Sequence, residues 1–404
     1  MPEEPARREA ILAAYERLGR GRALTVTGHP DEAEAEAEAL RGEAEALDYL
    51  PLSLELRGLD IEIMLWRLQF TQAQPQLRAL IREAEVAGLD ELGAELRVRQ
   101  AVAFTSRLGS LELQEATLEE AELALDRIGR PDDPRRLELE LVRVRLVGDT
   151  GDQDLALALC RAAAEHARRM GNERLVARTQ YDCAEVLFLL GRYADAERGY
   201  RDAHDSFERA LGPSEILDAQ LELVLAKIAL EQNKLDDAEH HVARARRFYK
   251  DLVDPRSTNM AALDFYEGYI HYQRFEFEAA AAAFTRVTEQ ALDHERLAEA
   301  WQGLGAIHFI QGDMAASLAA YRQARVYFLE VLGPEHSTLG SLESNIGESL
   351  AASGDLEGGR QAYSRALEIL ERALPPDHPD LAYPYKGRGQ LEFADGDLAG
   401  ARRD

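Results

Sequence analysis

The sequence predicts an all-α protein, a right-handed superhelical solenoid of antiparallel helix pairs. The first observation behind this prediction is a repeat, because Gly305, Gly347 and Gly389 are spaced by 42 residues. A Gly-Asp pair follows each of these glycines after seven residues, at 312–313, 354–355 and 396–397. A fixed period of this size is typical of stacked copies of one supersecondary unit.

The second observation is the composition. Ala, Leu, Glu and Arg dominate, aromatic residues make up 7% of the chain and charged residues 30%, which is typical of long amphipathic helices. The 404 residues would ordinarily fill two or three globular domains, but each unit of a repeat array packs only on its neighbours. We therefore expect one elongated array.

The N-terminal part contains one ambiguous segment. Residues 31–46 alternate Glu with Ala, which mimics the period of a strand. Both residue types are strong helix formers, and Pro30 and Asp31 form a helix start signal. This segment is predicted to be a helix.

The regular spacing continues upstream of Gly305 with one irregular step. Ala184, Ala226 and Gly268 are again 42 residues apart, whereas Gly268 and Gly305 are separated by 37 residues. We expect a loop to absorb this difference.

Residues 298–325 show how one repeat is built. Apolar residues at helical spacing lie on both sides of the segment 311–313, which predicts a helix, a tight turn and a second helix. Gly305 is small where the two helices must approach closely, and Tyr321 fills the space between them. Prolines that stop second helices stand in the connectors at Pro213, Pro255, Pro334 and Pro376.

The small residues, the Gly-Asp turn and the late Tyr321 and Ala324 resemble the tetratricopeptide repeat. The 42-residue period and linkers such as LGPEH at 332–336 resemble its kinesin light chain-type variety. The resemblance covers about Leu141 to the end of the chain. It implies degenerate helical repeats at 1–140 and regular repeats at 141–404.

The last regular repeat looks truncated. Its second helix has only started at Leu398–Ala401 when the sequence stops. Because an array ordinarily ends in a capping helix with a polar outer face, we expect a fragment. Self-association through this uncapped repeat is an alternative, which a charged residue in place of Leu398 would abolish.

Residues 40–59 (LRGEAEALDYLPLSLELRGL) resemble the degenerate repeats that lead into such arrays in bacterial, especially myxobacterial, serine/threonine kinases. Such kinases carry their catalytic domain before the repeats. The sequence has no glycine-rich phosphate loop, no His-Arg-Asp catalytic loop and no Asp-Phe-Gly metal motif. The resemblance therefore implies the non-catalytic part, which regulates an attached kinase or recruits its substrates.

The net charge of -27 argues against nucleic acid or an anionic membrane as the main partner, since most of the surface would repel both. Neutral or basic protein partners fit better. Cys160 and Cys183 stand in apolar helical patterns and fit reduced core residues, and no apolar run approaches a membrane helix. We expect a cytoplasmic protein, and the presence of only four lysines suggests a GC-rich bacterial genome.

The sharpest candidate for binding is the stretch 264–277. Its side chains Phe265, Tyr269 and Tyr272 fall at i, i+4 and i+7 and so share one helix face. First helices line the concave face of a solenoid of helix pairs, and the register with neighbouring repeats turns this face toward the groove. Tyrosines there would anchor a peptide or protein, although packing between repeats is the more common use of such a stripe.

Neighbouring first helices extend the predicted groove by their register with the small residues. The additional groove candidates are Tyr181, Glu185, Lys227, Gln302, Phe309, Asn345 and Glu348. The kinesin light chain-type resemblance places asparagines on this side, where Asn345 would hold a peptide backbone, while Ser344 departs from the pattern. Solvated helix surface is the alternative for each of these residues.

Chemistry other than binding finds little support. His271 and His308 occupy equivalent places, but a hydrogen-bonded core pair explains them better than a zinc site. Nucleophile, nucleotide-binding and metalloprotease motifs are missing, so we predict no catalytic residue, no metal and no cofactor. The leading hypothesis is a protein-interaction scaffold, and the alternative is a sensor whose superhelical pitch changes when a small peptide binds.

Overall fold

The structure is a computed structural model that describes residues 4–26, 29–67, 69–104, 111–149, 153–250, 252–253, 256–291, 294–374, 378–394, 396 and 400. Within these ranges all regular elements are helices and no strand occurs. The predicted all-α class, a solenoid of antiparallel helix pairs, is confirmed. Pro255, Pro376, Asp397 and Leu398 lie outside the described residues, so self-association through the last repeat stays a prediction.

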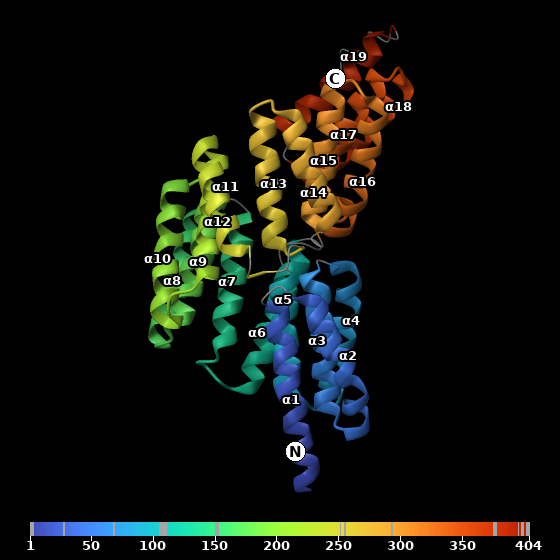
Figure 1. Cartoon of the computed structure of the whole chain (residues 1–404). Helices are drawn as coiled ribbons and strands as arrows, with labels where there is room; N and C mark the ends of the chain where they lie inside the picture. The colour runs from blue at the N-terminus through green and yellow to red at the C-terminus, as the bar shows by residue number, and fades with distance from the viewer. Residues whose placement is uncertain are drawn as a thin grey trace. The chain divides into compact units, whose positions relative to one another are not determined.

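The described residues form nineteen α-helices and one 3-10 helix (Figure 1). The helices up to residue 263 are α1 (Pro5–Val26), α2 (Pro30–Leu47), α3 (Leu50–Trp66), α4 (Phe70–Val86), α5 (Asp90–Phe104), α6 (Leu111–Ile128), α7 (Pro134–Asp149), α8 (Gln153–Arg169), α9 (Glu173–Leu189), α10 (Tyr193–Leu211), α11 (Glu215–Glu231), α12 (Leu235–Tyr249) and the start of α13 (Thr258–Gln273). They are followed by α14 (Phe277–Gln290), α15 (His294–Ile310), α16 (Met314–Leu332), α17 (Ser337–Ala352), α18 (Leu356–Ala373), η1 (Pro379–Leu381) and α19 (Ala382–Ala394). The predicted helix at 31–46 is α2.

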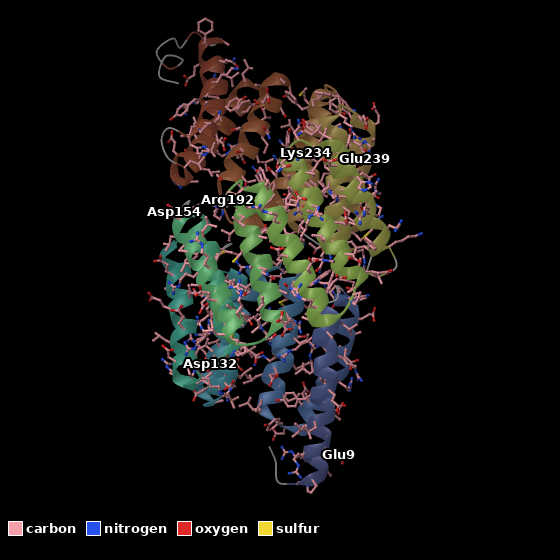
Figure 2. The ribbon with its side chains drawn as sticks, turned by 90° about the vertical axis from the view of Figure 1, so that its left-hand side faces the viewer. Glu9, Asp132, Asp154, Arg192, Lys234 and Glu239 are labelled. Atoms are coloured by element: carbon pink, nitrogen blue, oxygen red, sulfur yellow. The ribbon has the colours of Figure 1, made fainter. Side chains whose placement is uncertain are left out.

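The chain divides into two compact units, Met1–Leu263 and Asp264–Asp404. In both units helices pack on their neighbours in the chain, most extensively α9 on α10, α11 on α12, α15 on α16 and α17 on α18. Charged side chains such as Glu9, Asp154 and Glu239 project from the exposed faces of the first unit (Figure 2). The predicted change from degenerate to regular repeats at residue 140 concerns sequence regularity rather than compactness, and it stays a prediction.

The turn inside each helix pair uses one backbone conformation. Left-handed φ angles recur at the same place of successive repeats, in Gly191, Asn233, Phe275, Gly312, Gly354 and Gly396. Glycine adopts this region at no steric cost, which explains the glycine of the Gly-Asp pair. The aspartate caps the second helix, because the side chain of Asp313 accepts a hydrogen bond from the Ala316 amide at 3.0 Å.

The short step of 37 residues lies in a helix rather than in a loop. Helix α14 has 14 residues where α16 has 19. The expectation that a loop absorbs the difference is therefore wrong. The second helix of this repeat is more than one turn shorter, which its own hydrogen-bond ladder allows without a bulge.

A contact between a small residue and a large side chain holds each pair together. The two partners are 16 residues apart in Ala184 and Tyr200, Gly268 and Phe284, Gly305 and Tyr321, and Gly347 and Tyr363. A Cβ atom on Gly305 would lie 2.6 Å from the Tyr321 ring. The ring therefore occupies the space that any larger residue would need, as the sequence predicts for Gly305 and Tyr321.

Buried carboxylates form a second link between helices. Glu222, Asp264 and Glu343 each stand four residues before the small residue of their repeat and are less than 10% exposed. Buried charges require partners, and arginines of second helices supply them. The pairs are Glu222 with Arg244 at 3.0 Å, Asp264 with Arg286 at 3.2 Å, and Glu343 with Arg325 at 3.0 Å and Arg365 at 3.1 Å.

The cysteines behave as core residues. Cys160 is buried, Cys183 is half-buried, and both thiols are free. The contact with Cys160 and burial raise the pKa of the Cys183 thiol. Among the described helices, none combines the length and the apolar composition that a membrane span requires.

The glycine contact yields a stability prediction. Replacing Gly305→Ala should destabilise the fold by about 1–3 kcal/mol, because the buried Tyr321 ring must move. The matched control is Gly42→Ala, in the interior of α2, where a new Cβ meets nothing within 4 Å. The control should gain up to about 1 kcal/mol from helix propensity. Urea unfolding midpoints measure both, and equal shifts in the two variants would contradict the close approach.

Candidate functional site

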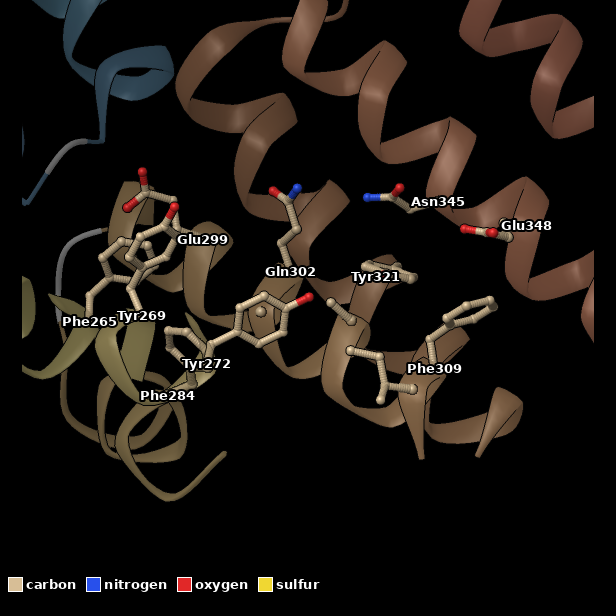
Figure 3. A pocket seen from close by; sticks show the side chains of 13 residues that line it. Phe265, Tyr269, Tyr272, Phe284, Glu299, Gln302, Phe309, Tyr321, Asn345 and Glu348 are labelled. Carbon is tan, nitrogen blue, oxygen red and sulfur yellow. The ribbon is translucent and has the colours of Figure 1, made fainter. Parts of the chain in front are cut away.

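One cavity gathers most of the predicted groove residues. It has a volume of about 520 Å³ and lies entirely within the second unit (Figure 3). Its lining residues are Phe265, Tyr269 and Tyr272 of α13, Phe284 of α14, Glu299, Gln302, Gly303, Ala306, Phe309 and Ile310 of α15, Tyr321 of α16, and Asn345 and Glu348 of α17. Seven of the ten predicted groove residues are among them. Their role in binding stays a prediction.

The cavity exists because the middle repeat has small side chains where its neighbours have large ones. Ala306 follows the small residue Gly305 by one position, and the same place holds Tyr269 in the repeat before and Glu348 in the repeat after. Gly303 adds a second gap on the same helix. The floor is therefore low at α15, and the side chains of α13 and α17 form walls.

Aromatic side chains of α13 form one wall. Phe265 is stacked on Tyr269 with ring centroids 6.5 Å apart, and it packs 5.6 Å from the buried Phe284 ring. Tyr272 packs 5.9 Å from Phe277. All three α13 side chains remain partly exposed. Both readings of the stripe thus describe Phe265, which packs between helices and also lines the cavity.

Two amide side chains occupy the middle of the cavity. Gln302 of α15 and Asn345 of α17 are drawn side by side above the Tyr321 ring in Figure 3. Within the described part of the chain, neither amide group has a hydrogen-bond partner. A carboxamide offers a donor and an acceptor together, which matches the backbone of an extended peptide.

The charged groups of the lining are both acidic. Glu299 pairs with Arg296, whose guanidinium lies 5.4 Å from the centre of the Phe265 ring. Glu348 accepts a hydrogen bond from the hydroxyl of Tyr383. Burial and the Glu348 carboxylate raise the pKa of Tyr383, which keeps this hydroxyl protonated as a donor. No lysine or arginine is among the residues that line the cavity.

The other three predicted groove residues lie in the first unit and satisfy one another. The Lys227 ammonium is 2.9 Å from a Glu185 carboxylate oxygen and 4.1 Å from the centre of the Phe188 ring. Glu185 also accepts from the Tyr200 hydroxyl. Tyr181 packs 5.1 Å from Tyr200. These side chains form an internal cluster around one ion pair.

The histidines differ from the expectation. His271 is half-buried, and its Nδ1 lies 2.5 Å from a carboxylate oxygen of Glu276 in the adjoining turn. His308 is also only half-buried, so the predicted hydrogen-bonded core pair is wrong. The predicted need of Glu267 for a partner is met by Arg286 at 3.0 Å. Neither histidine lines the cavity.

One group of side chains in the described residues has the spacing of metal ligands. The ligand atoms of His204, Glu208 and Asp218 lie within 4.8 Å of one another. His204 Nε2 is 3.0 Å from Asp218, a contact that joins α10 to α11 without any metal. This arrangement is sufficiently explained as a hydrogen bond between two helices.

Comparisons with known proteins agree with the fold. The family model of the tetratricopeptide repeat matches residues 175–251 and 338–403. These segments include the Glu185–Lys227 pair and the α17 wall of the cavity. Such repeats indicate a protein–protein interaction scaffold and are typically non-catalytic. A search of curated proteins finds no match.

Several solved structures are similar. A signal transduction ATPase with numerous domains and a tetratricopeptide repeat sensor, from Pyrococcus horikoshii, has 13% identity and a TM-score of 0.53, covering 86% of this chain and 50% of that one. BtubC from P. vanneervenii has 18% identity and a TM-score of 0.43, covering 60% and 94%. A putative kinesin light chain from Podosopora anserina has 12% identity and a TM-score of 0.39, covering 46% and 90%. The ATPase shares the fold, and this chain spans half its length.

Sequence reasoning did not select the residues that create the cavity. Gly303 and Ala306 matter because their side chains are small, and Phe284 and Tyr321 reach the cavity from second helices. The signal was present in the register, since Ala306 stands at the place of Glu348. Phe188 and Tyr200 were likewise missed beside the first-unit ion pair.

The first-unit ion pair yields a second prediction. Lys227→Met keeps the apolar stem on Phe188 but leaves Glu185 without its cation, which should cost about 1 kcal/mol because both side chains are about 30% exposed. A double-mutant cycle with Glu185→Gln should give a coupling of about 0.5–1 kcal/mol.

Lys234→Met is the control for this cycle. Lys234 is an exposed lysine of the same unit with no ion-pair partner among the described residues (Figure 2). Its replacement should change stability by less than about 0.5 kcal/mol in urea unfolding. Zero coupling between positions 185 and 227 would show that the pair is surface decoration.

Proposed function

We propose that the cavity of the second unit binds an extended segment of a partner protein, so that the chain works as a non-catalytic scaffold. The observation that carries this proposal is the presence of partly exposed aromatic rings and two unpaired amides around one cavity of about 520 Å³. Rings that offer an apolar body and a polar tip dominate many protein interfaces.

The chemistry of binding requires no covalent step. A segment that crosses the first helices would place apolar side chains against Phe265, Tyr269 and Tyr272. Its backbone would meet Gln302 and Asn345, where each carboxamide donates to a carbonyl and accepts from an amide. Apolar contacts would supply most of the affinity, and the amides would fix the direction and register of the chain.

The charge of the chain favours a neutral or basic partner. The net charge is -27, and the charged lining residues Glu299 and Glu348 are both acidic. An acidic segment would therefore be repelled during approach and at the site. Nucleic acid and anionic membranes are disfavoured for the same reason.

We further propose that the scaffold recruits substrates to a serine/threonine kinase, or regulates it, in a bacterial cytoplasm. The support is the resemblance of residues 40–59 to the repeats that precede such arrays in myxobacterial kinases. Phosphorylation of a captured partner by the attached kinase, lost when the cavity is altered, would test it.

A sensor is the second candidate. The volume of about 520 Å³ falls within the range of about 300–1,000 Å³ that small-ligand pockets occupy. A sensor would change its helix arrangement when a short peptide binds, whereas a scaffold would hold a longer segment without such a change. Small-angle X-ray scattering with and without a bound peptide separates the two.

The amides provide the sharpest test of binding. Gln302→Ala combined with Asn345→Ala should weaken the capture of a partner from a lysate of the source organism by about tenfold, since each hydrogen bond is worth about 0.5–1.5 kcal/mol. The captured protein is identified by mass spectrometry, and its affinity is then measured with purified components by calorimetry.

Gln323→Ala combined with Gln361→Ala is the matched control. Both glutamines are exposed on second helices of the same unit and lie outside the cavity. This control should leave capture unchanged, and both variants should keep the wild-type melting temperature. Equal capture by the cavity variant and the control would place partner binding elsewhere.

A further inference from the structure

The repeat register relates the ion pair of the first unit to the cavity of the second. The position after the small residue of each repeat holds Glu185, Lys227, Tyr269, Ala306 and Glu348 in successive repeats. The position three residues further holds an aromatic ring in Phe188, Tyr272 and Phe309. These two rows lie on one face of the first helices, because residues three apart are neighbours on a helix.

In the first unit these rows hold a cation in a specific way. Lys227 extends from its own repeat toward the previous one, where its ammonium lies 2.9 Å from Glu185 and 4.1 Å from the centre of the Phe188 ring. A carboxylate thus neutralises the charge while a ring face covers it, and both contacts favour a cation.

In the second unit the same rows have the ring and the carboxylate but lack the cation. Ala306 stands where the first unit has Lys227, and it leaves open space. Tyr272, Phe309 and Glu348 surround this space from three consecutive repeats (Figure 3). Within the described residues no lysine or arginine pairs with Glu348, which accepts from the neutral Tyr383 hydroxyl.

We infer that this space takes the side chain of a lysine or arginine from the bound segment, with its cation above Ala306 between the Tyr272 and Phe309 rings and the Glu348 carboxylate. The inference rests on the proposed function and specifies its partner, a basic segment of another protein. It is the chemistry of Lys227, supplied by the ligand instead of by the repeat.

The local charges favour this occupant over others. An acidic side chain would face Glu348 across the cavity and would be repelled. An apolar side chain would cover the rings but would remove water from the Glu348 carboxylate without replacing it. A carboxylate accepts several hydrogen bonds, so the bond from Tyr383 leaves acceptor positions for an incoming ammonium or guanidinium.

The experiment uses the full chain and a phage-displayed library of random heptapeptides as the probe. We expect the wild-type chain to enrich peptides with lysine or arginine at one position of the alignment. A synthetic peptide in which that residue is replaced by norleucine, which keeps the apolar stem, should bind about tenfold more weakly in fluorescence polarisation.

Two variants locate the effect. Glu348→Gln should reduce the preference for lysine over norleucine from about tenfold to less than about threefold, while peptide binding persists. Ala306→Lys should place a lysine at the Lys227 position, pair with Glu348 and abolish binding of the basic peptides without lowering the melting temperature. Ala306→Met fills the same space without charge and keeps Glu348 free of an internal cation.

The outcomes separate this inference from the proposed function. Enriched peptides without a basic residue, or a lysine preference that survives Glu348→Gln, would overturn the inference and leave a binding cavity. Peptides that bind Ala306→Lys and Ala306→Met as tightly as the wild type would overturn both, because they would bind outside the cavity. A library from which the folded chain enriches no peptide would also count against both.

Discussion

The packing of a large ring against a small residue is the constraint on which the rest of the structure depends. Gly305 lets the Tyr321 ring approach until no Cβ would fit, and the same contact recurs between Gly347 and Tyr363. Once the small residue faces the second helix, the positions around it have assigned directions, because side chains on a helix recur every 3.6 residues. The contact therefore also determines which residues face the groove. Stability and the position of the candidate site follow from one choice of side-chain size.

This dependence explains how much of the molecule could be predicted. The register that the small residues define is linear in the sequence, so it correctly brought Phe265, Gln302 and Glu348 to one cavity. The depth of the cavity was not predictable in the same way, since it arises from side chains that Ala306 lacks and from the rings of second helices. The shortened α14 was also unpredictable, because a helix loses turns without changing the pattern of its remaining residues. The partner of His271 is local to one turn, which a repeat pattern does not encode.

The two units use the same inner positions for different purposes. In the first unit Glu185, Lys227 and the Phe188 ring satisfy one another, so the inner face has no unpaired charge there. In the second unit Gln302 and Asn345 have no partner among the described residues, and Glu348 has a neutral one. Polar groups that are paired within the chain gain little from a ligand, whereas unpaired groups exchange water for it. The contrast favours the second unit as the place where a partner is recognised.

An internal lysine and a lysine brought by a ligand face different entropic costs. Lys227 is tethered to α11, so its contacts with Glu185 and Phe188 require only the ordering of one side chain. A free partner also loses translational and rotational freedom, which one half-exposed ion pair and one ring contact do not offset. The additional aromatic wall of Phe265 and Tyr269 and the amide pair are the contacts that make up the difference. A cavity that replaced its own lysine by a ligand's would therefore need these extra groups, and they occur in the repeats where the lysine is missing.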